Sequence, residues 1–420
     1  MNTTYSPDLH RAHLLYRSSR YAEAERLIRQ HMSQYPDDPV AITLLSDCLL
    51  RLDRPNEAEE LLKNALATQG HDEGVLSQAA VVVLHLGKYP EALSFIEDAL
   101  RITPGNADFR AIRAQILLFQ KEYRAALAEA NEALKVQPDH KAALNIRASA
   151  QMNLRDKISA YEALEAALRH DPGDSYTHAN MGWAKLQGND PKTAQEHFRE
   201  ALRLDPVNEH ARAGMVEAMK AKNPIYRLIL NFFFWLGSFK EGNQWLIILG
   251  AYLGYHALRS LSRSYPVFAP VIQPLLTLYI IFVLLTWAVE PLGNGVLLLD
   301  RNGRYALTDR QKLGARLVWP AAIIGFLGLI AYLITRQDIP VAIAYFGFSM
   351  LIPLSSVARW EKPAQRRKFG YIAIAFVVLG LLGLIPVFAT NTLGTNGFGT
   401  IYIIGLIGFQ FYANAQTMRD

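Results

Sequence analysis

The first half of the chain repeats one pattern of apolar and polar positions every 34 residues. Small apolar residues mark one position of this pattern, at Ala24, Ala58, Ala92, Ala126, Ala160 and Ala194. Helix-breaking residues keep the same interval, at Pro36, Gly70, Pro104, Pro138, Pro172 and Pro206. No insertion interrupts the register. A fixed period of this length indicates a solenoid, because a single helical unit cannot bury its apolar face without a neighbour.

Each period predicts two helices joined by turns. In the last period the first helix is expected near residues 176–186 and the second near 193–204. Gly182 and Ala194 lie where these helices would cross, and small residues there allow the axes to approach to the usual separation of about 8–10 Å. Pro206 follows the second helix, which must end there because proline has no backbone N–H.

This pattern resembles that of the tetratricopeptide repeat family. The match includes the small residues expected on the first helices, which are Ala12, Ala80, Ala114, Ala148 and Gly182. The resemblance covers about residues 5–206 in six repeats, and residues 207–222 look like the capping helix of the family. It implies an all-α fold that begins with a six-repeat solenoid, whose first helices line a concave groove for a protein or peptide.

Long apolar runs in the second half predict an α-helical transmembrane bundle. A helix needs about 20 mainly apolar residues to cross a bilayer, and the candidate spans are 244–260, 267–290, 317–335, 339–357, 371–389 and 398–415. Residues 225–239 are rich in aromatic side chains but short, so we expect an interfacial amphipathic helix there. A helix that docks against the repeats is the alternative. The expected domains are a solenoid with its capping helix over 1–222, an interfacial helix and linker over 223–243, and a bundle over 244–420.

Charge separates the two halves and predicts an orientation. Residues 1–222 carry a formal net charge of −4, and residues 223–420 carry a formal net charge of +9. Together they give the +5 of the whole chain. Lys and Arg gather in loops 291–316 and 358–370, and loops rich in these residues stay in the cytoplasm. With six spans, both termini and the repeats are then cytoplasmic, and the protein is a multi-pass protein of the inner (plasma) membrane. Residues 1–15 lack the apolar region of a signal peptide.

The basic loop 291–316 reads as more than a spacer. A short hairpin is expected around Asn302 and Gly303, and Thr308 with Gln311 has the spacing of a helix-capping box. Together with residues 223–227, this loop resembles segments of uncharacterised bacterial membrane proteins that carry N-terminal repeats of the same kind. The loop is interpreted either as a docking surface or as a folded cytoplasmic loop. Cys48, the single cysteine, fits a reducing compartment and is expected in a helix core.

No sequence motif announces a reaction. The metal helix His-Glu-x-x-His, the pair Cys-x-x-Cys, the phosphate loop and Gly-x-Ser-x-Gly are all absent from the sequence. We therefore expect no catalytic residue, no cofactor and no metal, and a protein that is not an enzyme. A nucleic-acid partner is disfavoured because the repeat half is slightly acidic. Glu290, at the end of a span, is expected to pair with Arg316 or Arg301, and a proton- or ion-carrying role is the alternative.

Groove positions supply the candidate binding residues. In the register of the family, those that face the groove include His13, Asp47, Gln115, Asn145, Tyr176, Asn180 and Trp183. Tyr176 and Trp183 lie seven residues apart and share a helix face with Asn180. Trp183 is alternatively a packing residue against the capping helix. The Lys, Asn and Arg slots with which relatives clamp a C-terminal carboxylate are filled differently here, so such a clamp is not expected.

These observations predict a membrane-anchored scaffold that recruits a protein or peptide partner to a membrane complex through the groove. The alternative is a regulatory or structural subunit of a membrane enzyme or transporter complex, with the bundle as its functional part. Membrane lipid at the basic loops and assembly into a homo- or hetero-oligomer are compatible with both interpretations.

Overall fold

The computed structural model describes residues 7–69, 72–360, 362–392 and 397–417, and the elements in these ranges are helices. The chain forms two compact units. The first consists of Met1–Gly188 with Glu200–Asn208, and the second of Asn189–Arg199 with Glu209–Asp420.

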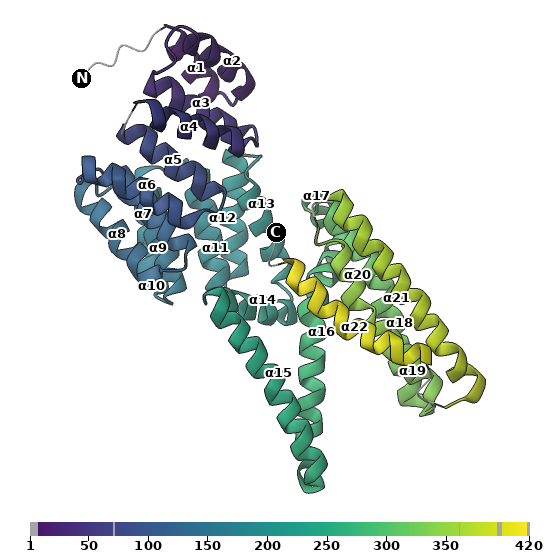
Figure 1. Ribbon diagram of the computed structural model, residues 1–420. Coiled ribbons are helices and arrows are strands. Elements are labelled where there is room, and N and C mark those ends of the chain that lie inside the picture. Colours follow the sequence, from purple (N-terminus) through teal and green to yellow (C-terminus); the bar gives the residue numbers. More distant parts are fainter. Residues whose placement is uncertain (1–6, 70–71, 361, 393–396, 418–420) are drawn as a thin grey trace. The chain divides into compact units, whose positions relative to one another are not determined.

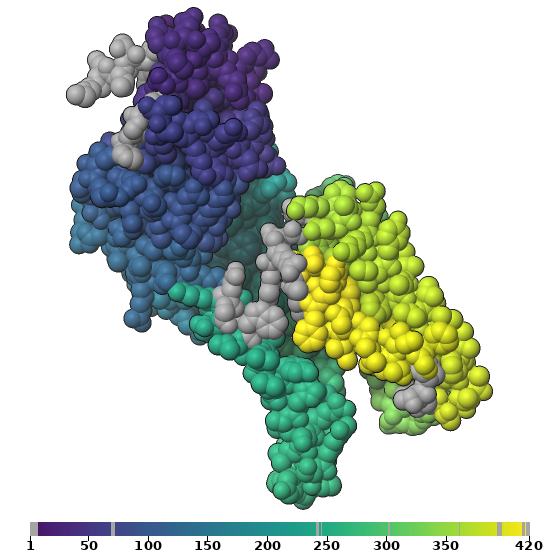
Figure 2. Space-filling view, in the orientation of Figure 1, coloured from purple at the N-terminus to yellow at the C-terminus, as the bar shows by residue number. Residues whose placement is uncertain are grey.

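The helix pairs that the 34-residue period predicts lie in the first unit, except that the start of the last second helix belongs to the second unit (Figure 1). The first helices of the pairs are α1 (Pro7–Arg17), α3 (Pro39–Arg51), α5 (Glu73–His85), α7 (Ala107–Phe119), α9 (Lys141–Asn153) and α11 (Ser175–Gln187). The second helices are α2 (Tyr21–Met32), α4 (Pro55–Gln69), α6 (Tyr89–Ile102), α8 (Tyr123–Val136), α10 (Lys157–His170) and α12 (Pro191–Leu204). Successive repeats follow one another as adjacent bands of colour in Figure 2, as expected where each repeat contacts its neighbours.

The same period that marks the helix ends also places a cap at the start of the first helices. These N-cap residues are Asp38, Asp72, Asn106, His140 and Asp174, and their side chains accept hydrogen bonds from backbone N–H groups of the first turn. In four of the five the cap follows a periodic proline by two residues. Each proline thus ends one helix, and the cap begins the next by satisfying N–H groups that have no partner within the helix.

A left-handed backbone residue separates the two helices of each pair. Its positive φ recurs at Ser19, Asp53, Gly87, Lys121, Arg155 and Asn189, with values between 59° and 75°. Only one of the six is glycine, although side chains disfavour this conformation by roughly 1–2 kcal/mol. At this turn the left-handed backbone conformation therefore recurs in every repeat, whereas the residue type varies.

The core of the array consists of the periodic alanines and their apolar neighbours. All six alanines of the period are 0% exposed, which confirms that they lie at the helix contacts. Cys48 is also buried, and burial raises the pKa of its thiol to about 12. This supports the interpretation of Cys48 as a core residue, because the thiolate form is needed for reactivity.

Packing between repeats shows which layer is innermost. Each first helix from α1 to α9 packs against the next first helix as well as against its own partner. Within the described residues, successive second helices do not approach one another as closely. A stack whose first layer is crowded and whose second layer is spread is curved, so the first helices line the concave face.

The second unit contains the remaining helices. They are α13 (Glu209–Lys220), α14 (Pro224–Gly237), α15 (Glu241–Ser264), α16 (Ala269–Leu299), α17 (Arg301–Ala306), α18 (Asp309–Thr335), α19 (Asp338–Ser349), α20 (Leu351–Val357), α21 (Pro363–Thr390) and α22 (Gly397–Thr417), with a 3₁₀ turn at Pro266–Phe268. Asn223 caps helix α14, and Pro224 occupies the first turn of this helix. Helix α13 packs on α16 and α17, and α14 packs on α16.

Four stretches of this unit are long and apolar enough to cross a membrane, judged by length and composition. They are Pro266–Leu299, Asp309–Thr335, Asp338–Val357 and Pro363–Thr390, and they contain four of the six expected spans. The first expected span lies on α15, which falls outside this group, and the sixth lies on α22, whose apolar part Gly397–Ala413 is shorter. The six-span topology therefore stays a prediction.

Glycines bring the helices of the bundle into close contact. Gly325 and Gly328 of α18 face Gly347 and Ala344 of α19, and a methyl group added at Gly347 would lie 2.3 Å from the backbone nitrogen of Gly325. Only Arg336 and Gln337 separate these two helices, and Arg336 has a φ of 55°. Small residues on both helices thus allow this helix pair to pack closely.

The hairpin expected around Asn302 and Gly303 is wrong. Helix α16 continues past Pro291 to Leu299, and the following residues form helix α17. A proline within a helix removes one backbone hydrogen bond, and here the surrounding packing holds the helix intact. The capping box further along the loop is confirmed, since Thr308 and Gln311 each accept a hydrogen bond from the backbone N–H of the other.

Candidate functional site in the repeat groove

The seven candidate binding residues all lie on first helices of the repeats. His13 is on α1, Asp47 on α3, Gln115 on α7, Asn145 on α9, and Tyr176, Asn180 and Trp183 are on α11. His13 and Tyr176 are exposed, Tyr176 by 52%. Asp47, Gln115, Asn180 and Trp183 are half-buried, and Asn145 is 3% exposed.

Hydrogen bonds across the last two first helices connect three of the polar groups. The amide nitrogen of Asn145 donates to Thr177 Oγ1 at 2.8 Å and to the carbonyl of Lys141 at 2.9 Å. The Asn145 Oδ1 atom accepts from Asn180 Nδ2 at 2.7 Å. Asn145 therefore fixes the side chain of Asn180, which is the more exposed of the two amides.

A second polar cluster lies near the other end of the array. Gln78 Nε2 on α5 donates to Asp47 Oδ1 at 2.7 Å and reaches Ser46 Oγ at 3.3 Å. Burial raises the pKa of the Asp47 carboxyl, while the hydrogen bond from Gln78 and the charge of Arg51 oppose this rise. A half-buried carboxylate with a neighbouring cation suits a hydrogen-bond donor from a partner, such as the backbone N–H of a peptide.

The structure brings together some of the expected residues and leaves others apart. Asn145 and Asn180 touch directly, whereas His13, Asp47 and Gln115 lie on different repeats along the array. Sequence reasoning missed Thr177, whose hydroxyl joins the Asn145 cluster. Thr177 follows the N-cap Asp174 by three residues and donates its backbone N–H to the Asp174 side chain at 3.0 Å. The position of Thr177 three residues after an N-cap is the feature of the sequence that could have identified it.

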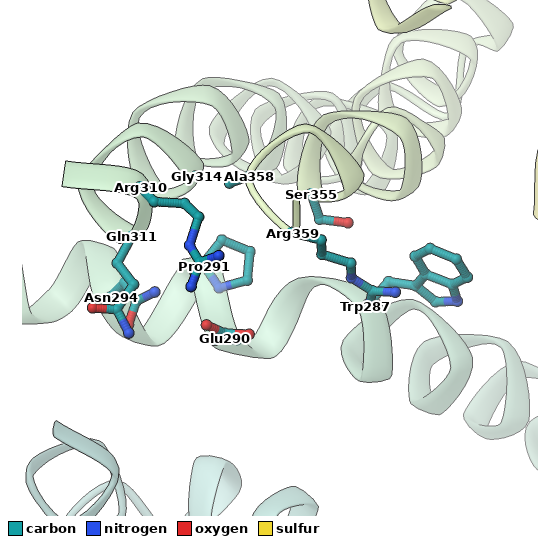
Figure 3. A pocket seen from close by; sticks show the side chains of 10 residues that line it. All are labelled: Trp287, Glu290, Pro291, Asn294, Arg310, Gln311, Gly314, Ser355, Ala358 and Arg359. Atoms are coloured by element: carbon teal, nitrogen blue, oxygen red, sulfur yellow. The ribbon is translucent and has the colours of Figure 1, made fainter. Parts of the chain in front are cut away.

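A separate pocket of about 190 Å³ lies within the second unit (Figure 3). Its lining residues come from α16, from the first two turns of α18, from the end of α20 and from the turn after α20: Trp287, Glu290, Pro291, Asn294, Arg310, Gln311, Gly314, Ser355, Ala358 and Arg359. We expected Glu290 to lie with Arg316 or Arg301. Arg316 is exposed and is not part of this pocket, the side chain of Arg301 lies outside the described residues, and the pocket's cations are Arg310 and Arg359.

Metal-binding chemistry has no support in the part of the chain that the structure describes. No group of three or more His, Cys, Asp or Glu side chains there could hold a metal ion. The polar groups of the candidate groove residues and of the pocket lining are amides, hydroxyls, an imidazole, an indole N–H, guanidinium groups and two carboxylates, Asp47 and Glu290. These are groups for hydrogen bonding and for ionic recognition.

The first unit has the fold of a helical-repeat array. Tetratricopeptide repeat models match residues 15–78, 83–150 and 176–208. These residues thus form tetratricopeptide repeats, and long apolar helices follow them in the chain. No curated protein sequence matches the chain.

Several solved structures are similar to part of the chain. MamA from Desulfovibrio magneticus RS-1 is 24% identical, with a TM-score of 0.33, and the match covers 41% of this chain and 97% of that one. PilF from Pseudomonas aeruginosa is 15% identical, with a TM-score of 0.39, covering 50% of this chain and 96% of that one. YrrB, described as a TPR protein with an unusual peptide-binding site, is 18% identical, with a TM-score of 0.31, covering 44% and 95%. At these identities the likeness concerns the fold alone.

Proposed function

We propose that this protein is a membrane-anchored scaffold that recruits a protein or peptide partner to a membrane complex. The repeats bind the partner along the concave face of their first helices, and the apolar helices hold the chain in the inner (plasma) membrane with the repeats on the cytoplasmic side. The observation that carries the proposal is the hydrogen-bonded row of Asn145, Thr177 and Asn180 across two first helices. Amides held rigidly in this way lose little side-chain freedom when a partner binds.

Two aromatic side chains of the same helix support a peptide ligand. Tyr176 is 52% exposed on α11, and tyrosine is enriched among the residues that dominate interface energetics. Trp183 lies two turns further along the same face. An aromatic contact flanked by a fixed amide can hold both a side chain and the backbone of an extended segment.

Site-specific photocrosslinking in native membranes tests the proposal. A benzophenone amino acid replaces Tyr176 on a first helix, and the matched control replaces Ile158, which is 75% exposed on the second helix α10. We expect a discrete crosslinked product from position 176 and none from position 158. Equal crosslinking at both positions, or none at position 176, would contradict binding in the groove.

The charged pocket of the second unit favours the alternative function, that of a regulatory or structural subunit of a membrane enzyme or transporter complex. The two functions differ in their sensitive residues. In the scaffold, replacing Trp183 and Asn180 by alanine removes the crosslinked partner, whereas Glu290→Gln leaves it in place. Loss of cellular function from Glu290→Gln with the crosslinked partner retained would favour the subunit.

A further inference from the structure

The pocket of the second unit has an excess of positive charge at one end of the apolar helices. Arg310 and Arg359 line it together with a single carboxylate, Glu290. In the view of Figure 3, Glu290 lies between the two arginines. The three side chains carry a net charge of one positive unit, so an anion with one negative charge would neutralise the pocket.

Arg359 is held in a defined orientation. Its guanidinium lies 4.3 Å from the ring centroid of Trp287, and Trp287 is itself buried. A cation stacked on an aromatic face keeps its planar set of N–H donors directed to the side. Arginine in such an arrangement recognises phosphate through two parallel hydrogen bonds, which a lysine cannot reproduce.

A buried acceptor in the same pocket has no donor. Asn294 is 2% exposed, and its Oδ1 atom has no hydrogen-bond partner among the described residues. An unsatisfied buried carbonyl costs roughly 1–3 kcal/mol. The oxygens of a phosphodiester cannot donate to it, but a hydroxyl group on the same ligand can. The pocket therefore calls for both a phosphate and a hydroxyl.

The position of the pocket indicates the source of the phosphate. Its walls come from the C-terminal part of α16, the N-terminal turns of α18 and the C-terminal end of α20. In sequence these are the ends of three consecutive apolar stretches, and further basic residues follow at Lys312 and in 362–368. If these helices cross a bilayer, this level is the head-group layer, where anionic lipids attract basic side chains.

We propose that this pocket binds the head group of an anionic phospholipid, specifically a phosphodiester that carries a hydroxyl group, as in phosphatidylglycerol. Arg310 and Arg359 bind the phosphate, and Asn294 accepts a hydrogen bond from the hydroxyl. Glu290 keeps the excess charge to a single unit, which favours a diester over a doubly charged phosphate. This site is distinct from the groove and does not depend on the proposed scaffold function.

Native mass spectrometry of the full chain in detergent, titrated with single lipids, tests the site. Phosphatidylglycerol is expected to bind at least about tenfold more tightly than phosphatidylethanolamine, which has no net charge. Arg310→Gln and Arg359→Gln are each expected to weaken phosphatidylglycerol binding about tenfold, the effect of losing one charge-assisted hydrogen bond. The matched control is Arg316→Gln, which removes an exposed charge from the same helix and is expected to change binding less than about twofold.

Glu290→Gln is expected to strengthen phosphatidylglycerol binding, whereas the arginine substitutions weaken it. It raises the excess charge of the pocket from one unit to two, so phosphatidylglycerol should bind more tightly than to the unchanged protein. Asn294→Leu removes the acceptor and should erase the preference for phosphatidylglycerol over phosphatidylmethanol, a phosphodiester without a hydroxyl. Arg359→Lys keeps the positive charge and replaces Arg359→Gln in the experiment if that variant does not fold. It should also weaken phosphatidylglycerol binding, because lysine cannot form the two parallel hydrogen bonds.

Several results would overturn the assignment. The assignment is wrong if the zwitterionic and anionic lipids bind equally well. It is also wrong if Arg316→Gln weakens binding as much as Arg310→Gln does, or if Glu290→Gln binds phosphatidylglycerol more weakly than the unchanged protein. A titration with soluble glycerophosphoglycerol distinguishes a lipid head group from a soluble phosphodiester as the ligand of the pocket. If it binds with the same dependence on Arg310 and Arg359 while the lipid does not, the ligand is a soluble phosphodiester and the lipid assignment is wrong.

Discussion

Asn145 forms its side-chain hydrogen bonds with other residues of the repeat array. Its side chain donates to Thr177 and Lys141 and accepts from Asn180, so a candidate binding residue is also a link between two repeats. Such a residue affects a ligand mainly by holding Asn180 in position. Substitutions at Asn145 must therefore be judged by stability as well as by binding.

Replacing Asn145 by alanine is expected to destabilise the protein by about 1–3 kcal/mol, because Thr177 and Asn180 each lose a buried partner. Thermal unfolding measured by circular dichroism checks this. The control is Asn153→Ala on the same helix, since Asn153 donates to the carbonyl of Ser149 within this helix and, among the described residues, makes no side-chain hydrogen bond to another repeat. An equal loss of stability in both variants would contradict the role of Asn145 between repeats.

The Asp47 carboxyl predicts a dependence of stability on pH. Burial raises its pKa in the folded state above the unfolded value, so folding favours the protonated form, and this group's contribution to stability falls as the pH rises through that interval. Asp47→Asn keeps an acceptor for Gln78 and removes the charge. Its unfolding temperature should exceed that of the unchanged protein at pH 7, and the difference should vanish as the pH falls below the ordinary pKa of an aspartate. A difference that does not vary with pH would contradict this account.

At the scale of the helices, the sequence predicts the repeats well because one interval controls several features. The alanines of the contacts, the prolines that end the second helices and the caps of the first helices all recur every 34 residues. The left-handed turn residues share the interval but not a residue type, since they include Ser19, Lys121 and Arg155. They could not be read from composition, because the packed helices on either side impose the turn.

The loop after α16 shows where sequence reasoning fails. The dipeptide Asn302-Gly303 favours a hairpin turn when strands flank it. Here helical residues flank it, and α17 packs on α13 and on α16, so tertiary contact decides the local structure. The pocket was missed for a similar reason: Glu290, Arg310 and Arg359 are distant in sequence, and no short motif connects them.

The glycine contact between α18 and α19 makes a sharp prediction. In Gly347→Ala the new methyl group would meet the backbone of Gly325, which cannot rotate away, so the helices must separate. We expect a loss of about 1–3 kcal/mol, the usual cost of overpacking, in thermal unfolding of the detergent-solubilised chain.

Gly250→Ala on α15 is the matched control, because nothing lies within 4 Å of the added carbon. Alanine is the better helix former, so this variant should be as stable as the unchanged protein or slightly more stable. Comparable destabilisation of both variants would show that the α18–α19 contact has no special role.

At the scale of the whole molecule, membrane orientation is the main open prediction. Reporter enzymes fused after Asp338 should report the outer side, and fusions after Lys362 the cytoplasmic side, because the basic residues lie at the second position. A cytoplasmic signal from the fusion after Asp338 would refute the six-span arrangement.

The side of the repeats depends on α15, the span with the weakest apolar character, and can be measured independently. Cys48 is buried with a raised thiol pKa, so it gives little background in thiol labelling. A new cysteine in Ile158→Cys should react with a membrane-impermeant maleimide only after the cells are opened. Labelling of intact cells would place the repeats outside and would contradict the proposed localisation.

The left-handed backbone that recurs at every turn also bears on how such an array changes in length. Gly87 and Lys121 occupy equivalent points with nearly the same left-handed φ, although one has a side chain and the other has none. A chain cut at two such points and rejoined would lose one whole unit and keep the geometry of the join. The reach of the concave face is thus set in steps of one module, and evolution can lengthen or shorten it without redesigning the helices on either side.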